Sequence, residues 1–251
     1  MNYYEKTINV NVQGNVSPLK EISFYEYRNL VKRLYDDDIV SVSNAFEDLL
    51  LATCSAKPKD LDILQKFIIL LHLRNIVVSP MIEMVVNEVQ INYPVNEIIS
   101  ALNKKIAACE YLYGDTKYTF GLPKELLPHQ NIIAFVVNCL LKIDDGIFVD
   151  PNQLPALPFN EITQLILNFY SDVKIVVPHV NQTLSPFDGS MLGFLKSIYT
   201  YDLKGLYDIE YTLRRNLGLH ANDFQNLSLP ECNIMLKNLN DDLKSKAQVE
   251  S

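Results

Sequence analysis

Apolar residues recur at helical spacing in one segment after another, and this pattern constrains the fold more than any other feature of the chain. In the first such stripe, the apolar side chains stand at positions i, i+3, i+4 and i+7, which places them on one face of a helix. This stripe consists of Tyr27, Leu30, Val31 and Leu34. Comparable stripes occupy residues 45–50, 61–73, 95–107, 162–169, 191–199, 203–217 and 229–244. The sequence therefore predicts a predominantly α-helical protein.

Two short segments alternate instead with a period of two, which is typical of strands. Near the N-terminus Ile8, Val10 and Val12 alternate with polar residues, and the turn residues at 13–15 follow. Residues 108–120 form a second such segment with a turn at Gly114 and Asp115. We therefore expect an α+β fold that is predominantly α-helical, with small antiparallel β-hairpins near residues 5–24 and 108–120.

Polar residues indicate where several helices begin. Ser41 or Ser43 is expected to cap the second helix and Asp60 the third. Ser228 and Glu231 have the spacing of a capping box, with a proline in the first turn, and predict the start of the last helix. The last helix should pack on the helix at 203–217 and bury Leu239 and Leu243, with the adjacent Asp241 and Asp242 exposed. Periodicity leaves residues 76–95 ambiguous, with β structure favoured, and does not decide between helix and strand for residues 132–141.

The best candidate for a boundary lies at residues 150–159, which contain Pro151, Pro155 and Pro158. It divides the chain into an N-terminal region at 1–150, with the first hairpin, helices and a central hairpin, and a helical region at 151–251. With 251 residues in all, we expect the two regions to form one compact unit.

Charge and hydropathy exclude several classes of protein. The formal net charge is −8, and no basic cluster of the kind that binds nucleic acid stands out. The longest purely apolar run, residues 132–137, is far shorter than the ~20 residues of a membrane-spanning helix. The start of the chain lacks the pattern of a secretory signal. We therefore expect an intracellular protein that contacts neither membrane nor nucleic acid, with its four cysteines reduced.

The sequence contains no motif that is diagnostic of a particular enzymatic reaction. Glycine is scarce, and the sequence has no glycine-rich phosphate loop, nucleophile elbow or zinc-binding motif. No two of the four histidines stand at i, i+3 or i, i+4, and the cysteines have no metal-binding spacing. The paired Asp144 and Asp145 have the appearance of a turn. We therefore expect no catalytic residue, metal or cofactor. The alternative is an enzyme whose general base is His129 or His179, each beside a proline bend.

Tyrosine is abundant, with 14 residues, whereas tryptophan is absent. Aromatic residues are dense at 24–35 and again at 194–211. Tyrosine and arginine are the residue types that most often anchor protein interfaces. The candidate partner-binding residues, expected on exposed faces, are Tyr25, Arg28, Tyr207 and Tyr211.

Three blocks of the chain together resemble the baseplate hub assembly proteins of T-even-type phages. The first is residues 22–30, where an aromatic, charged, leucine-containing helix follows a strand. The second is residues 61–78, a helix that ends in a Leu-x-Arg segment. The third runs from residue 192 to a Pro-Glu start of the final helix at 230–231. The chain departs from the family pattern at Cys232 and Asn233, directly after that start.

The resemblance implies a role without catalysis in building the central hub of a contractile tail. It implies a chaperone, a scaffold or a minor hub subunit, whose partners are other hub and tail proteins. Such a protein acts in the host cytoplasm during assembly, and the tail baseplate of the virion is its second implied location.

Overall fold

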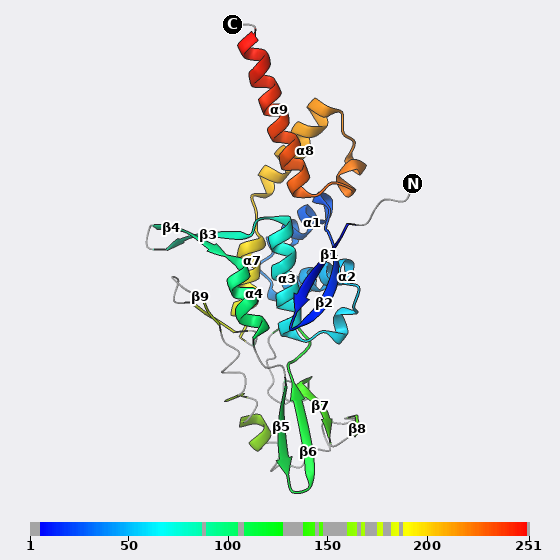
Figure 1. Cartoon of the computed structure of the whole chain (residues 1–251), viewed down its shortest axis with the longest axis vertical. Helices are drawn as coiled ribbons and strands as arrows, with labels where there is room; N and C mark the ends of the chain where they lie inside the picture. Colours follow the sequence, from blue (N-terminus) through cyan, green and yellow to red (C-terminus); the bar gives the residue numbers. More distant parts are fainter. Residues whose placement is uncertain are drawn as a thin grey trace.

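The computed structural model of the chain describes residues 6–86, 89–104, 108–127, 138–143, 146–147, 160–164, 167–168, 175–177, 182–185 and 188–249. The fold is α+β and predominantly helical with small antiparallel sheets, which confirms the predicted class. A central helical body separates the hairpin of strands β5 and β6 at one end from helices α8 and α9 at the other (Figure 1). Within the described ranges, no helix combines the length and the apolarity that crossing a bilayer requires.

Helix α3, residues Ile63–Val77, is the centre of the body. Its apolar side chains point in all directions, which is typical of a helix that is buried on every side. It contacts helices α2, α4 and α7 and strand β1. The helices of the body are α1 (Phe24–Leu34), α2 (Ile39–Thr53), α3, α4 (Val95–Asn103) and α7 (Ser190–Tyr199). The three helices predicted before residue 75 are therefore confirmed.

Both predicted hairpins are present. Strands β1 (Thr7–Val12) and β2 (Asn15–Lys20) pair antiparallel, and Gln13 and Gly14 both have positive φ in the tight turn between them. Strands β5 (Ala108–Tyr113) and β6 (Thr116–Gly121) pair around the turn at Gly114. Strands β7 (Leu140–Ile143) and β8 (Gly146–Ile147) add to this second hairpin and form a four-stranded sheet in the order β5-β6-β7-β8.

The structure also decides part of the ambiguous segments. Strands β3 (Met81–Val86) and β4 (Val89–Pro94) form a third hairpin, so the β preference of residues 76–95 is confirmed beyond the end of α3. Residues 140–143 are strand, and residues 132–137 lie outside the described ranges. A short pair of strands, β9 (Ile175–Val177) and β10 (Gln182–Leu184), precedes α7. The candidate boundary at 150–159 lies outside the described residues, and the division into two regions stays a prediction.

Two predicted helix caps were wrong by a few residues. Asp38 caps α2, because its carboxylate accepts hydrogen bonds from the main-chain N–H groups of Val40 and Ser41, and the two serines lie inside the helix. Asp62 caps α3 in a reciprocal capping box with Gln65. Asp60 instead ends a short 3₁₀ helix, η1 (Pro58–Asp60).

The last part of the described chain forms a C-terminal unit of helix α8 (Leu203–Leu217), 3₁₀ helix η3 (Ala221–Gln225) and helix α9 (Leu229–Val249). Helices α8 and α9 pack together as predicted, and Phe224 is buried in their connection. Helix α9 continues well beyond the crossing with α8 (Figure 1). For this reason Leu243 is exposed and Leu239 only half-buried, against the prediction, whereas Asp241 and Asp242 are exposed as predicted.

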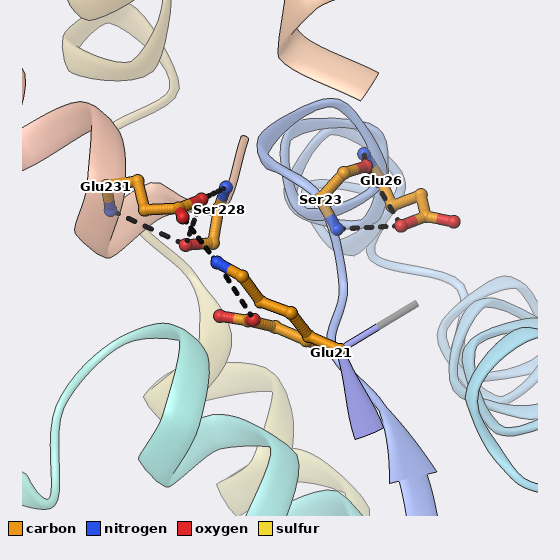
Figure 2. A network of polar contacts seen from close by, with 6 residues as sticks. Glu21, Ser23, Glu26, Ser228 and Glu231 are labelled. Carbon is orange, nitrogen blue, oxygen red and sulfur yellow. Dashed lines mark hydrogen bonds and ion pairs between the residues drawn. The ribbon is translucent and has the colours of Figure 1, made fainter. Parts of the chain in front are cut away.

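Helix α1 and the preceding strands hold this unit against the body. The rings of Phe24 and Phe224 lie 5.4 Å apart, and the main-chain N–H of Phe24 donates to the carbonyl of Leu227 at 2.6 Å. Two capping boxes, Ser23 with Glu26 on α1 and Ser228 with Glu231 on α9, therefore lie close together (Figure 2).

Lys6 joins the body to the C-terminal unit, because it forms ion pairs with Glu21 at 3.8 Å and with Glu231 on α9. Burial by itself would raise the pKa of Glu231, but hydrogen bonds from Lys6 and Ser228 outweigh it and lower the pKa below the ordinary 4.5. The carboxylate form of Glu231 is therefore the one that the folded protein favours.

A buried polar network joins α3, α7 and α1. Arg74, in the last turn of α3, is buried and donates to the main-chain carbonyls of Ser79, Met81 (2.8 Å) and Ile198 (3.3 Å). The hydroxyl of Tyr199 donates to the Leu70 carbonyl, and that of Tyr27 donates to the Tyr199 carbonyl at 2.9 Å. Burial raises the pKa of both tyrosines, although the nearby Arg74 charge opposes the shift, so both hydroxyls stay protonated as donors.

The first prediction concerns this network. Arg74→Met should lower the free energy of unfolding by about 3 kcal/mol, because it leaves the buried carbonyl of Ile198 and the partly buried carbonyls of Ser79 and Met81 without their donor. Urea denaturation followed by circular dichroism measures the change. Arg33→Met is the control, since Arg33 forms an exposed pair with Asp48 of the kind worth less than about 1 kcal/mol. Equal losses in the two variants would contradict the central role of Arg74.

The second prediction concerns pH. Because the pKa of Glu231 is lowered on folding, its contribution to stability is complete above the unfolded value of 4.5 and is lost as the pH falls through the folded value. Glu231→Gln should therefore lower stability at pH 7 and flatten the decline of stability below about pH 4.5. Glu26→Gln is the matched control, because it alters the same position of the other capping box and leaves the Lys6 contacts in place. An acid profile of Glu231→Gln that parallels the wild type would refute the assignment.

Candidate protein-interaction surface

Two helices from distant parts of the chain build one surface. On α1, Tyr25 and Arg28 lie one turn apart; Tyr25 is exposed, and Arg28 lies between it and the buried residues of the helix. On α8, Tyr207, Glu210 and Tyr211 lie within one turn of each other. Helix α1 contacts α8, and the four predicted residues Tyr25, Arg28, Tyr207 and Tyr211 are thereby gathered at one place. We call them the tyrosine–arginine surface.

Arg28 is the centre of this surface. Its guanidinium carbon lies 5.2 Å from the centroid of the Tyr25 ring and 5.1 Å from that of Tyr207, within the range of cation–π attraction. Its Nη1 also forms an ion pair with Glu210. The side chains of Arg28 and Glu210 are only 14% and 13% exposed. The expectation that Arg28 is exposed was therefore wrong, since the two rings and the carboxylate cover it, and its part is to hold the rings in place.

The three tyrosines remain open to solvent. Tyr25 is 39% exposed, Tyr207 45% and Tyr211 62%. Because Arg28 contacts the rings of Tyr25 and Tyr207, these two are fixed before any partner arrives. Exposed and pre-positioned aromatic rings are the features of an interface anchor.

An open groove of about 990 Å³ runs along the α8 side of the surface. Its walls come from α1, α8 and residues 218–220. Gly218 ends α8 with φ of +70°, a left-handed conformation that favours glycine, and the turn brings Leu219 and His220 to the groove. The main-chain N–H of His220 donates to Asp223 at 2.6 Å, and His220 is the N-cap residue of η3.

Two arginines of the groove were not among the predicted residues. Arg214 lies 3.7 Å from the second oxygen of Glu210, and Arg215 donates to the hydroxyl of Tyr211 at 3.2 Å. Both follow Tyr207 and Tyr211 at helical spacing, so extending the predicted stripe along α8 would have included them.

The histidines, cysteines and acidic residues were also considered for catalysis or metal binding. His72 lies on α3 with Nε2 3.2 Å from the carbonyl of Asn11, and its burial lowers its pKa. Burial raises the pKa of Cys232 to about 12, which keeps this thiol protonated and unreactive. No group of three histidine, cysteine or acidic residues suited to a metal occurs among the residues that the structure describes. His129, His179, Asp144 and Asp145 lie outside them.

The tyrosine–arginine surface is therefore the best-supported site in the described structure. Its geometry joins exposed aromatic area, a covered guanidinium and an adjoining groove. Comparisons of the chain with protein-family models, with curated proteins and with solved structures gave no match.

Proposed function

We propose that this protein functions by binding other proteins, and that the tyrosine–arginine surface is where it binds them. The observation that carries the proposal is the convergence of Tyr25 and Arg28 with Tyr207 and Tyr211, which are about 180 positions away in the chain. Each pair lies on its own helix and gains its surroundings only when α8 packs on α1. The fold therefore builds this arrangement by a long-range contact.

The chemistry of the surface suits a protein partner. A tyrosine ring offers a large contact area and loses little conformational entropy on binding, because only two side-chain torsions are restricted. The contact of Arg28 with two rings reduces that loss further. Tyrosine faces can also stack nucleic-acid bases, but a net charge of −8 opposes a polyanion.

For the biological setting we propose assembly of a contractile phage tail, on the basis of the three blocks that resemble baseplate hub assembly proteins. The partners are then other hub and tail proteins. The protein acts as a chaperone, a scaffold or a minor hub subunit, in the host cytoplasm and, if it is retained, in the baseplate. It works by differential affinity: it binds a hub component in one state and releases it when assembly favours another.

The third prediction tests the surface. Tyr207→Ala and Tyr211→Ala should each weaken co-purification with the hub partner by roughly 30-fold or more, since anchors of this type contribute about 2 kcal/mol. Tyr113→Ala is the matched control, because Tyr113 is also an exposed tyrosine but lies on the β5–β6 hairpin at the other end of the molecule. Complementation of a deletion phage gives the functional readout, and circular dichroism checks folding. Equal complementation by all three variants would refute the proposed surface.

The fourth prediction addresses the alternative of an enzyme. His72, His129, His179 and His220 replaced singly by Gln should leave tail assembly intact, apart from stability losses of about 1 kcal/mol that are typical of single substitutions. Infectious particles are counted for each variant after its folding has been confirmed. A variant at His129 or His179 that folds normally but yields no particles would favour catalysis.

A further inference from the structure

We infer that the groove beside the tyrosine–arginine surface receives an acidic peptide segment of the partner. This inference rests on the proposed function and adds the chemistry of what is bound. Three observations support it: which charged side chains of the groove are already paired, the opposite sign of the net charge of the whole chain, and the apolar groups beside the arginines.

Of the two carboxylates that line the groove, Glu210 is held in ion pairs and Asp208 is exposed. The lining contains Arg28, Arg214 and Arg215 against Asp208 and Glu210. Glu210 forms its close ion pair with Arg28, and both side chains are largely covered. The longer contact of Glu210 with Arg214, at 3.7 Å, leaves the Arg214 side chain 50% exposed. The accessible charges that remain are those of Arg214, Arg215 and Asp208, which leaves the groove with a surplus of one positive charge.

Arg215 adds to this surplus. Its guanidinium donates to the neutral hydroxyl of Tyr211, and the residue is exposed. Together with Arg214 it offers neighbouring planar guanidinium groups, each of which can bind a carboxylate through two parallel hydrogen bonds. A backbone carbonyl or an amide side chain of a partner would use these donors less fully, so carboxylates fit them best.

The surplus is local, because the whole chain carries −8. A long polyanion would meet repulsion beyond the groove. A short acidic segment meets mainly the two arginines and the single carboxylate of Asp208, since charges farther than about 8 Å are screened at physiological salt. The rings of Tyr207 and Tyr211 and the side chain of Leu219 supply apolar contacts beside the arginines. The favoured ligand is therefore a short segment with acidic residues next to apolar ones.

Cations in the last turn of a helix also stabilise that helix by interacting with its dipole, and Arg214 and Arg215 occupy this position on α8. Helix α1 has the same arrangement with Lys32 and Arg33, which do not line this groove. A double variant of Arg214 and Arg215 and one of Lys32 and Arg33 each remove two positive charges from the last turn of a helix. Comparison of the two separates ligand binding from the effect on the helix.

The experiment is a selection from a random twelve-residue peptide library displayed on yeast, with the purified full-length protein as bait. Peptides that also bind the Tyr207→Ala variant are discarded, so that the retained ones depend on the surface. We expect the retained peptides to carry more Asp and Glu than the unselected library. Arg214→Gln combined with Arg215→Gln should weaken their binding at least tenfold, and Lys32→Gln combined with Arg33→Gln should change it less than twofold.

The outcomes separate the two proposals. Retained peptides that are neutral or basic would overturn the acidic specificity and leave the proposed surface standing. Acidic peptides that bind the α8 and α1 double variants equally would also overturn it. Failure to obtain any peptide that depends on Tyr207 would count against both proposals. The composition of peptides selected on the wild-type protein is informative even if the α8 double variant folds poorly.

Discussion

The buried guanidinium of Arg74 is the contact on which the rest of the architecture depends. A charge inside a protein is costly unless it is hydrogen-bonded, and here carbonyl groups from the loop after α3, the start of β3 and the end of α7 accept from the guanidinium. These three segments are therefore held at one point. Tyr27 reaches the same point through the carbonyl of Tyr199, which fixes how α1 lies on the body.

Helix α1 links this core to the candidate site. Tyr27 faces the core and the next residue, Arg28, faces α8, so a single turn of helix serves both purposes. The C-terminal unit contacts α1 through the Phe24–Phe224 pair and the Arg28–Glu210 pair, and Lys6 contacts Glu231 from the position just before β1. The geometry of the tyrosine–arginine surface consequently depends in part on contacts outside the groove, such as the Phe24–Phe224 pair.

Local features were predictable from the sequence, and those that depend on distant contacts were less so. The helical stripes and the two hairpins follow from periodicity and turn residues, which act over a few positions. The caps at Asp38 and Asp62 were missed because several polar residues stand near each helix start and only the structure shows which carboxylate accepts the bonds. The residue types at the site pointed to Tyr25, Arg28, Tyr207 and Tyr211. The covering of Arg28 could not be foreseen, since its partner Glu210 lies 182 positions away.

Helix α9 passes from core to solvent along its own length. Leu229 and Cys232 are buried, Leu236 packs against the core from a partly buried position, and Leu243 is exposed. At ~1.5 Å per residue, its 21 residues span roughly 30 Å, and helices without tertiary support are marginal in water. Protection of its amide protons from exchange should therefore decline from one end to the other. Within a single helix, the first turns open only when the core opens, while the last turns open on their own.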